Sequence, residues 1–429
     1  YLFDPFRGDP HTHYQLLTVL SERFPSWEFL LIDLRGIKRE FAVYHIPECD
    51  LYLYSDYTLD HGELTALCSQ LKERFPKARH VVGGPHAMVY QDGCLESFDS
   101  VVVGEGEEVV CEAVADASNG GLRPVYRQDR SVDLDDYPIP SREFLPEATV
   151  ARKGLLSIKT SRAYDDVMGT TALFSRGCPF ACRFCAMPAR KIFSPSIRYR
   201  SPANVRTEIE HLKARYGIGG LNLFDEIVLP LKRESASKHL EAIGSTGIVW
   251  RGQNRVDGLT DELAILAKQA GCIQISIGIE SVWQPTLDVI DKRIEIGQAK
   301  QAIEILKRAG IECRVYLISG LPGEPPDIVK RTLDFLEETK PDTAVVSLFT
   351  VRPGTDVFDR PERYGIEEVR SEWDGTMHLY NRYGSERPER PTFRYAKDGP
   401  WGLQPSEERV VGNFLELQAE IDARGMGRA

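Results

Sequence analysis

Three of the chain's cysteines lie within eight positions of one another, in the segment RGCPFACRFC (176–185). Cys178, Cys182 and Cys185 are separated by three and then two residues, so a single loop can place all three thiolates around one inorganic cluster. Cysteine thiolates are the ligands that iron–sulfur clusters prefer, and three of them leave one iron of a four-iron cube without a protein ligand. We therefore expect a [4Fe–4S] cluster here, with one iron open to a further ligand.

Zinc and a set of buried structural thiols are the alternatives for these cysteines. A structural zinc site takes four protein ligands, and the sequence around 176–185 offers neither a histidine nor a fourth cysteine. A catalytic zinc takes three protein ligands, but three thiolates from one short loop would make it a poor Lewis acid. The spacing therefore favours the iron–sulfur cluster.

The cysteine segment directly follows the first of a series of apolar runs that alternate with helical patterns. We expect strands at TALFSRG (171–177), GLNLFDE (220–226), GIVWRGQ (247–253), IQISIGIE (273–280), ECRVYLISG (312–320) and TAVVSLFTV (343–351). Strands separated by helices, as in PANVRTEIEHLKARYG and GQAKQAIEILKRAG, predict βα units and a parallel sheet. Residues 151–358 are therefore expected to form a partial (β/α)6 barrel, with its chemistry at the carboxyl ends of the strands.

CxxxCxxC after the first strand of such a barrel resembles the radical S-adenosylmethionine (SAM) superfamily, and Phe184 matches the aromatic residue that usually precedes the third cysteine. In that superfamily the amino and carboxylate groups of SAM chelate the open iron. The resemblance implies that one electron from the cluster cleaves SAM into methionine and the 5′-deoxyadenosyl radical.

The resemblance also implies SAM-binding residues at the ends of the second and third strands. Asp225 and Glu226 stand where the superfamily places acceptors for the SAM ammonium group, and a carboxylate is a suitable partner for a cation. Their alternative is a solvated helix cap. Gln253 and Arg255 are candidates for contacting the ribose or the carboxylate of SAM, with a surface salt bridge as the alternative.

Three later motifs resemble further parts of the superfamily. IQISIGIES (273–281) is similar to its GxIxGxxE strand, with Gly278 and Glu280 near the equivalent positions, although the first glycine is absent. ISGLPGE (318–324) is similar to the fifth-strand signature, whose glycines, with Gly320 among them, would admit adenine against the backbone. RPGT (352–355) is similar to the usual YPGT. Arg352 replaces the aromatic residue there, and it is a candidate contact for a substrate carboxylate or phosphate.

The first 118 residues alternate shorter apolar runs with helical segments. We expect strands at YLFDPF (1–6), EFLLIDL (28–34), DLYLYSD (50–56), RHVVGG (79–84) and DSVVVGEGE (99–107). Such a pattern predicts an α/β fold with a parallel sheet covered on both faces, that is, a Rossmann-like doubly wound domain. Ligands of these domains lie beyond the carboxyl ends of the strands. No GxGxxG follows the first strand, so a conventional dinucleotide site is not expected.

Two further segments complete the expected domain organisation. Residues 119–150 are rich in Pro, Asp and Arg with little periodicity, which predicts an interdomain linker on the surface. Residues 359–429 are expected to form a small C-terminal region that ends in a helix near SEERVVGNFLELQAEID (406–422).

A doubly wound domain before this barrel resembles the cobalamin-binding radical SAM enzymes. The motifs VVGGPHA (81–87), VVVGEGEE (101–108) and DLDDYPIPSR (133–142) carry that resemblance. It implies that a corrin lies between the two domains, with its lower face on the loops that follow the strands. The residues expected to contact cobalamin are Ser55, Asp56, Gly83, Gly84, Pro85, His86, Gly104 and Glu105. Ordinary strand-to-helix turns are the alternative reading of these loops.

A cobalt ligand is a separate question. GDPHTHY (8–14) is superficially similar to the DxHxxG loop whose histidine ligates cobalt in other cobalamin domains, and His11 is the candidate. Tyr14 occupies the glycine position, so a helix-start residue is the alternative for His11. His86 is expected to support the corrin or its tail rather than to bind the metal.

Composition limits the partners and the compartment. The 429 residues carry a net charge of −11, from 53 basic and 64 acidic residues, which favours a small-molecule or peptide substrate over nucleic acid. No apolar run is long enough for a membrane span. The six scattered cysteines are expected to be free core residues, as in a reduced cytoplasmic protein: Cys49, Cys68, Cys94, Cys111, Cys272 and Cys313. The sequence begins at Tyr1 without Met, which indicates that the natural N-terminus is not included.

Together these features predict a cobalamin-dependent radical SAM enzyme, served by a one-electron reductant of the flavodoxin or ferredoxin type. The favoured activity is methyl transfer to an unactivated carbon through the 5′-deoxyadenosyl radical and methylcobalamin, because polar transfer cannot reach such a carbon. The alternatives are a non-methylating radical reaction, such as cyclisation, ring rearrangement, oxidation or sulfur insertion, and a non-catalytic corrinoid or cluster sensor. Methylthiotransferases need three further clustered cysteines, which this sequence lacks, so one cluster is expected.

Overall fold

The computed structural model describes residues 11–34, 36–58, 60–128, 130–186, 196–370 and 391–427. The described chain forms two compact units, one reaching to Val150 and one containing Ala151–Ala186 and the residues from Ile197 onward. The strand expected at YLFDPF (1–6) lies outside the described residues.

The first unit is built on a parallel sheet. Its described strands are, in spatial order, β1 (Leu51–Ser55), β2 (Arg79–Gly83), β3 (Ser100–Val103) and β4 (Val125–Arg127). The helices of this unit are α1 (His11–Arg23), η1 (Arg39–His45), α2 (His61–Arg74), α3 (Pro85–Val89), α4 (Gln91–Leu95), α5 (Val109–Ser118), η2 (Leu134–Asp136) and α6 (Glu147–Val150).

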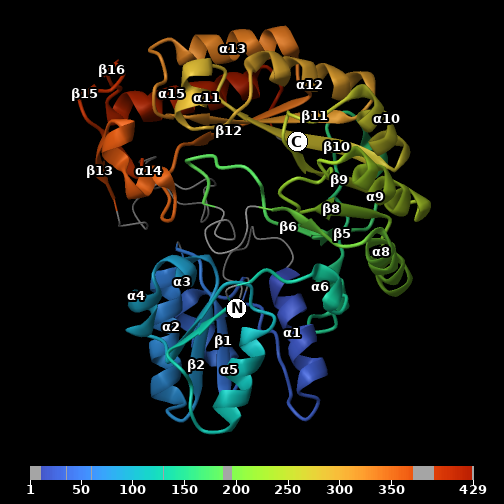
Figure 1. Cartoon of the computed structure of the whole chain (residues 1–429), viewed down its shortest axis with the longest axis vertical. Helices are drawn as coiled ribbons and strands as arrows, with labels where there is room; N and C mark the ends of the chain where they lie inside the picture. The colour runs from blue at the N-terminus through green and yellow to red at the C-terminus, as the bar shows by residue number, and fades with distance from the viewer. Residues whose placement is uncertain are drawn as a thin grey trace. The chain divides into compact units, whose positions relative to one another are not determined.

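Helices cover both faces of this sheet, which explains the apolar residues at the centre of its strands. Val82 and Val101 point to the face that α2, α3 and α4 cover, while Val81 and Val102 point to the opposite face, which α5 covers. Helix α1 packs beside α5 through Leu20. Figure 1 shows the two groups of helices on opposite sides of the sheet. Continuous apolar strands are the signature of such a doubly covered parallel sheet.

Two segments of the first unit differ from the sequence-based expectation. Residues 28–34 were expected to form a strand, but they form none, because they pair with no strand of the part of the chain that the structure describes. Conversely, β4 lies inside the segment expected to be an irregular linker (119–150), where it pairs with β3. Strand formation depends on a pairing partner as well as on an apolar pattern.

The second unit contains a larger parallel sheet. Its described strands are, in spatial order, β12 (Thr343–Leu348), β11 (Glu312–Ser319), β10 (Cys272–Glu280), β9 (Val249–Asn254), β8 (Gly220–Leu223) and β5 (Gly169–Ala172). Shorter strand pairs are β6 (Ser175–Arg176) with β7 (Arg198–Tyr199), β13 (Ile366–Val369) with β14 (Phe393–Tyr395), and β15 (Asp398–Gly399) with β16 (Gly402–Leu403). The helices are η3 (Arg162–Tyr164), α8 (Pro202–Tyr216), α9 (Arg233–Ser245), α10 (Asp261–Gln269), α11 (Gln284–Val289), α12 (Ile296–Arg308), α13 (Ile328–Thr339), α14 (Asp356–Asp359), η4 (Pro361–Tyr364) and α15 (Glu407–Ala423).

Consecutive strands of this sheet are neighbours, as expected when each helix returns the chain to start the next parallel strand. The helices pack side by side in sequence order, α8 with α9, α9 with α10, α10 with α12 and α12 with α13 (Figure 1). Strands β5 and β12 are the edges of the described sheet, so it is open. These observations confirm the α/β class with parallel sheets, and each expected strand from 171 to 351 overlaps a strand of the structure.

Local sequence signals explain where several helices start. Helix α8 begins after Ser201, whose Oγ accepts a hydrogen bond from the Asn204 N–H at 3.3 Å. Helix α12 begins with a capping box, in which the Glu295 side chain accepts from the third helical residue while Gln298 accepts from the Glu295 N–H. Such caps fix where each strand-to-helix turn ends, and these turns carry the candidate site.

The turn after β11 is closed by the C-terminal helix α15. Gly320 has a positive φ of 88°, and a Cβ placed there would lie 2.8 Å from a methyl carbon of Val410 in α15. The Tyr395 hydroxyl donates a hydrogen bond to the Gly320 carbonyl at 3.0 Å. The glycine is therefore required by the chain's own packing, because a side chain would separate α15 from the sheet.

Gly320→Ala is expected to destabilise the protein by about 1–3 kcal/mol, because alanine strains the left-handed backbone and collides with Val410. Thermal unfolding followed by circular dichroism would measure the loss. Gly412→Ala in α15 is the matched control, since nothing lies within 4 Å of a Cβ at that position. A Gly320→Ala protein that unfolds at the wild-type temperature would contradict this account of the turn.

Candidate functional site

The three clustered cysteines lie on a loop that leaves the sheet after β5 and β6. Cys178 and Cys182 are half-buried, and Cys185 is exposed. The loop turns back on itself, since the Cys185 N–H donates to the Cys182 carbonyl at 3.1 Å. It is also anchored to the end of α11, where the Arg183 N–H donates to the Ile290 carbonyl at 2.9 Å. Three thiols on one short anchored loop fit an iron–sulfur cluster.

The surroundings of Cys178 favour the protonated thiol when no metal ion is bound. Burial raises the pKa of the Cys178 thiol, and the nearby Cys182 and Glu226 raise it further, while Arg255 opposes them. A bound metal would displace the proton, because cysteine ligates as the thiolate.

Arg255 is the central positioning residue of the cysteine loop. Its guanidinium lies 3.6 Å from the ring centroid of Phe180, and its Nη1 is 3.6 Å from the Cys182 sulfur. Its Nε donates to Asp257 at 2.7 Å, and its Nη2 donates to the Lys292 carbonyl at 2.8 Å. Arg255 therefore does form a salt bridge, with Asp257, but a buried one, because Arg255 is only 6% exposed. The planar guanidinium thus joins the cysteine loop to the turn after β9.

The two carboxylates after β8 have different environments. Asp225 is 2% exposed and accepts hydrogen bonds from the Phe174 N–H at 3.2 Å and from the Ser175 hydroxyl at 2.5 Å. Burial raises the pKa of Asp225 to about 7 in spite of these hydrogen bonds. Glu226 is exposed, although the protein around it still raises the pKa of its carboxyl through desolvation. Asp225 therefore holds in place the residues that lead into the cysteine loop, whereas the Glu226 carboxylate is accessible to solvent.

The turn after β10 is organised by an ion pair. Lys292 Nζ lies 2.6 Å from Glu280 Oε1, and both side chains are almost buried. Glu280 has a positive φ of 69°, and its carboxylate folds over Gly278, where a Cβ would approach Glu280 Oε1 to 2.5 Å. Because the Lys292 carbonyl accepts from Arg255, these residues continue the network that holds the cysteine loop.

The remaining expected residues of this unit lie at the ends of strands or in turns. Gln253 and Phe184 are half-buried, and Gln253 uses its carbonyl to accept from Val228 at 2.9 Å. Arg352 is half-buried, and its carbonyl accepts from the Thr355 hydroxyl at 2.7 Å, at the start of α14. Gly320 faces Val410 in α15.

Glu324, the last residue of ISGLPGE, belongs to the same region but was not singled out by its sequence. Its Oε2 accepts from the Gly320 N–H at 3.0 Å. Burial raises the pKa of Glu324 to about 8, and hydrogen bonds from the Gly320 and Leu321 amides oppose the rise. A buried carboxyl that titrates near neutrality helps to shape the turn after β11.

In the first unit, the loops after β1 and β2 pack tightly on each other. The Asp56 N–H donates to the Gly83 carbonyl at 2.7 Å, and the Asp56 carbonyl accepts from the His86 N–H at 3.1 Å. Gly84 has a φ of 101°, and a Cβ there would lie 2.7 Å from the Asp56 carbonyl oxygen. Pro85 occupies the first turn of α3. The two loops of Ser55–Asp56 and Gly83–His86 therefore form one surface at the sheet edge.

The loop after β3 is tied to the segment that follows β4. The Glu105 carboxylate accepts a hydrogen bond from the Val132 N–H at 3.3 Å, and Gly104 forms the preceding turn. The GEGE loop thus lies at the same edge of the sheet as the loops after β1 and β2, because parallel strands end together.

The histidines of this unit fall into separate environments. His11 is buried at the first position of α1. His86 donates to or accepts from the Thr58 hydroxyl at 3.1 Å and stacks on His61 with ring centroids 4.0 Å apart. Burial, followed by the nearby His61, lowers the pKa of His86 to about 3. His61 was not predicted, because a single histidine at a helix start carries no spacing signal.

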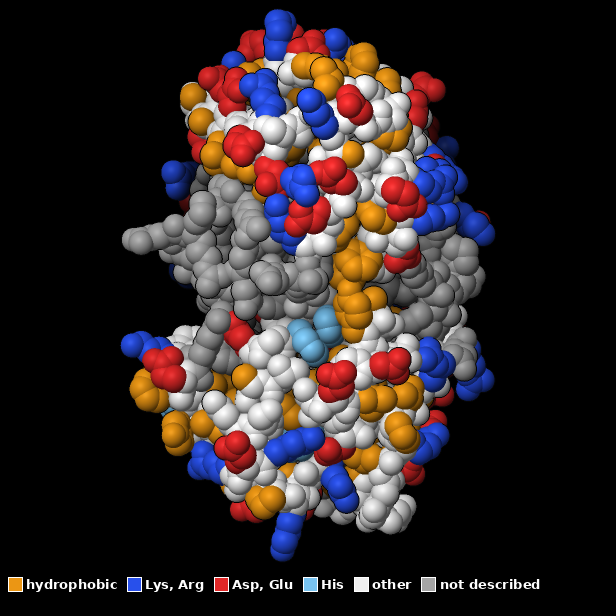
Figure 2. Space-filling model, turned by 90° about the vertical axis from the view of Figure 1, so that its left-hand side faces the viewer, with side chains coloured by type: hydrophobic (Ala, Val, Ile, Leu, Met, Phe, Trp, Pro, Cys, Tyr) orange, Lys and Arg blue, Asp and Glu red, His pale blue; other side chains and the backbone are white. Residues whose placement is uncertain are grey.

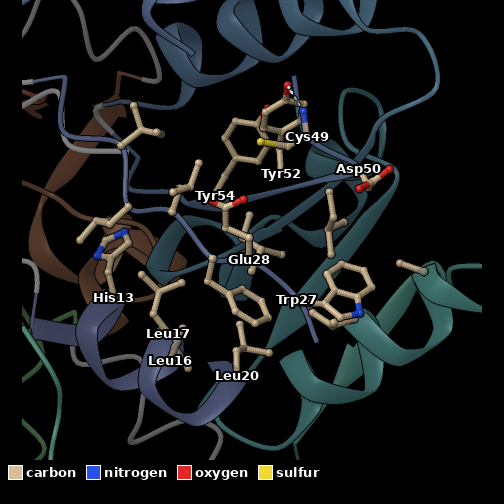
Figure 3. Close-up of a pocket in the computed structure, with 18 of the residues that line it drawn as sticks. His13, Leu16, Leu17, Leu20, Trp27, Glu28, Cys49, Asp50, Tyr52 and Tyr54 are labelled. Carbon is tan, nitrogen blue, oxygen red and sulfur yellow. Dashed lines mark hydrogen bonds between the residues drawn. The ribbon is translucent and has the colours of Figure 1, made fainter. Parts of the chain in front are cut away.

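A cavity of about 730 Å³ lies beside β1 in the first unit. Figure 3 shows Leu16, Leu17 and Leu20 of α1 on one side of it, with Trp27 and Tyr54 also in its wall. Residues 28–34, the segment expected to form a strand, line it as well. The cavity therefore borders the edge strand of the described sheet, and it reaches Ser55 among the expected cobalamin residues.

The surface has mixed charge. Figure 2 shows acidic and basic side chains interspersed over the face in view. Among the described helices, none combines the length and apolar character needed to cross a membrane.

Comparison with known proteins agrees with the geometry of the second unit. Residues 173–336 match the Radical SAM superfamily. The chain is 29% identical over 303 residues to an anaerobic magnesium-protoporphyrin IX monomethyl ester cyclase of Cereibacter sphaeroides, covering 67% of this chain and 49% of the relative. It is 25% identical to the bacteriochlorophyllide d C-12(1)-methyltransferase of Chlorobaculum tepidum, covering 80% of this chain and 68% of that protein. The chain thus spans about half the length of the cyclase.

A solved structure has the same fold. It is the radical S-adenosylmethionine methyltransferase TsrM from Kitasatospora setae, with cobalamin and a [4Fe–4S] cluster bound. The TM-score is 0.63 at 17% identity, and the match covers 85% of this chain and 76% of TsrM. The family match at residues 173–336 includes Cys178, Cys182 and Cys185. It therefore implies a [4Fe–4S] cluster and SAM for this chain. Residues 173–336 thus form a radical SAM domain, and the chain shares its fold with a radical SAM methyltransferase that was solved with cobalamin bound.

Proposed function

We propose that the chain is a cobalamin-dependent radical SAM methyltransferase that acts on an unactivated carbon of a small molecule or peptide. The observation that carries the proposal is the loop of three closely spaced cysteines, which Arg255 and Asp225 hold at the carboxyl end of the parallel sheet. The relation to a bacteriochlorophyllide methyltransferase and the fold shared with TsrM support methyl transfer.

Cys178, Cys182 and Cys185 would hold the cluster through their thiolates. When bound, the cluster supplies the electron that cleaves SAM, received from a reductant of the flavodoxin or ferredoxin type, and cobalamin supplies the methyl carrier. Arg255 would fix the loop and place a positive charge beside the Cys182 sulfur, which lowers the cost of a buried thiolate.

Glu226 is the residue proposed to accept the SAM ammonium group. It is exposed, and it lies near enough to Cys178 to raise the pKa of that thiol. Asp225 already accepts from the backbone and from Ser175, so we assign it the task of holding the loop. Gln253, Gly278, Glu280 and Gly320 stay proposed contacts for the rest of SAM, and Phe184 stays a proposed neighbour.

The loops of the first unit are proposed to receive cobalamin. Gly83 and Gly84 offer backbone without side chains, and Ser55, Asp56, Pro85, His86, Gly104 and Glu105 surround them at one sheet edge. The cavity beside β1 offers mostly apolar space next to Ser55. His11 stays a candidate cobalt ligand and Arg352 a candidate substrate contact.

A second candidate function is favoured by one observation. The cyclase relative is 29% identical to this chain and the methyltransferase relative 25%, so a radical reaction without methylation, such as ring formation, would use the same SAM site. In methyl transfer a second SAM molecule gives up its methyl group and becomes S-adenosylhomocysteine, whereas the non-methylating reaction forms no S-adenosylhomocysteine.

Product analysis separates the two. Anaerobic enzyme with cluster, cobalamin, reductant and a responsive substrate is expected to form S-adenosylhomocysteine together with 5′-deoxyadenosine, in roughly equal amounts, because one SAM provides the methyl group and another the radical. Liquid chromatography with mass detection measures both products. Deoxyadenosine formed without S-adenosylhomocysteine would overturn the methyltransferase proposal and leave the radical SAM assignment in place.

Glu226→Gln is expected to weaken SAM binding about 10- to 100-fold, since it removes one charge-assisted hydrogen bond. Asp225→Asn should weaken SAM binding less than Glu226→Gln does. It should instead lower the amount of iron that the cysteine loop retains. Wild-type affinity should also fall as the pH is lowered through the raised pKa of Glu226, because only the ionised carboxylate attracts the ammonium group.

Anaerobic isothermal titration calorimetry on cluster-loaded protein would measure these affinities, and iron analysis would measure cluster retention. Glu234→Gln is the control, because that exposed carboxylate pairs with Lys238 on α9. If Glu226→Gln binds SAM as the wild type does while Asp225→Asn does not, the two roles are assigned the wrong way round.

A further inference from the structure

Four side chains gather in the first unit, apart from the cysteine loop. They are Asp56, His61, His86 and Cys94, and one ligand atom from each lies within 4.8 Å of every other. Asp56 follows β1, His61 begins α2, and the other two lie on α3 and α4. The set is spread over the sequence, and it converges because β1 and β2 end at the same edge of the sheet.

The contacts within this set are close. His61 Nδ1 lies 2.7 Å from Asp56 Oδ2, and the Cys94 sulfur lies 3.9 Å from the same oxygen. The rings of His61 and His86 are stacked, with centroids 4.0 Å apart. Thr58 Oγ1 lies 3.1 Å from His86 Nδ1 and fixes the orientation of that ring. An outer partner of this kind is usual for histidines that ligate metals.

Asp56 provides an independent reason to expect a ligand. Its side chain is 0% exposed, and its Oδ1 has no hydrogen-bond partner among the residues that the structure describes. A buried acceptor left without a partner costs about 1–3 kcal/mol. The backbone of Asp56 is fixed by Gly83 and His86, so the carboxylate cannot easily turn to solvent. His61 and Cys94 contact the other oxygen, Oδ2, so a cation that is bound by the carboxylate through Oδ1 would satisfy the orphaned atom.

The donor types select the cation. Two imidazoles, one carboxylate and one thiolate are ligands for zinc and similar ions, whereas magnesium and calcium prefer oxygen ligands alone. Asp56 and the Cys94 thiolate together carry two negative charges, so a divalent ion makes the buried site neutral. Cys94 would release its proton to solvent when the ion binds. With four protein ligands the site would be closed, as structural zinc sites are.

We propose that Asp56, His61, His86 and Cys94 bind a divalent first-row transition-metal ion, with Zn²⁺ preferred. The ion would join α2, α3 and α4 to the end of β1 and so stiffen the loop that contains Gly83 and Gly84. His61 is partly exposed, which gives the ion a path from solvent. Asp56 and His86 are also proposed to lie against cobalamin, so this proposal gives their side chains to the ion and leaves only their backbone for the corrin.

The test is zinc content in the full chain with the [4Fe–4S] cluster loaded and no corrinoid added. After dialysis against a weak chelator, mass spectrometry of the metal is expected to find about one zinc per chain. Cys94→Ser and His86→Gln should each reduce it at least fivefold. Cys68→Ser is the matched control, because Cys68 is an equally buried free cysteine on α2 that lies outside the site. Circular dichroism checks that each variant is folded.

Two further measurements show whether the zinc binds at the four proposed residues or at the cysteine loop. Zinc should persist when Cys178, Cys182 and Cys185 are all changed to Ala, which excludes binding at the cysteine loop. Replacement by Co²⁺ in the otherwise unaltered chain should give the thiolate-to-cobalt absorption of a cysteine-ligated ion, and this needs no variant at the site. Absence of zinc and of that absorption from the wild type, or zinc lost only with the loop cysteines, would overturn the proposal. Failure to bind hydroxocobalamin would count against the proposed function alone.

Discussion

The Arg255 guanidinium connects the cysteine loop to the ends of two strands. It stacks on Phe180, approaches the Cys182 sulfur, and uses its other nitrogens on Asp257 and the Lys292 carbonyl. A buried charge is tolerated only when its hydrogen bonds are satisfied, so these partners must all be in place for Arg255 to be buried. Lysine lacks the planar fork and could not make the same set of contacts. The position of the loop therefore depends on the correct assembly of β9, β10 and the turns after them.

Hydrogen bonds between loops also organise the first unit, but there the backbone makes them, where the second unit uses the Arg255 guanidinium. Gly84 lets the second loop approach Asp56, and the resulting hydrogen bonds fix the Asp56 carboxylate in a buried position. Around it gather His61, His86 and Cys94. In both units the proposed sites lie at the carboxyl ends of parallel strands, where loops from distant parts of the sequence are brought together.

Much of the fold was predictable because it depends on local pattern. Each continuous apolar run from 171 to 351 overlaps a strand of the structure, since doubly covered strands need apolar residues on both faces. The run at 28–34 failed as a predictor, because a strand also needs a neighbour with which to pair, and the described sheet ends at β1. The cysteine loop was recognisable because its three ligands are adjacent in sequence.

The contacts that hold the site were not predictable, because they join residues far apart in the chain. Arg255 reaches Cys182 across 73 positions and Lys292 across 37. Neither spacing forms a pattern, and only the sheet order brings the residues together. The same holds for Asp56 and Cys94, which are separated by 38 positions. Sequence identified Glu280 as a candidate SAM contact but gave no sign of its partner Lys292.

The central claim is that Cys178, Cys182 and Cys185 hold a four-iron cluster with one iron open to SAM. Electron paramagnetic resonance of the anaerobically loaded and reduced protein, recorded with and without SAM, tests it most directly. The account predicts the signal of a reduced [4Fe–4S] cluster, and it predicts that SAM changes that signal. A spectrum that SAM leaves unaltered, or a loop that holds zinc in place of iron, would contradict it.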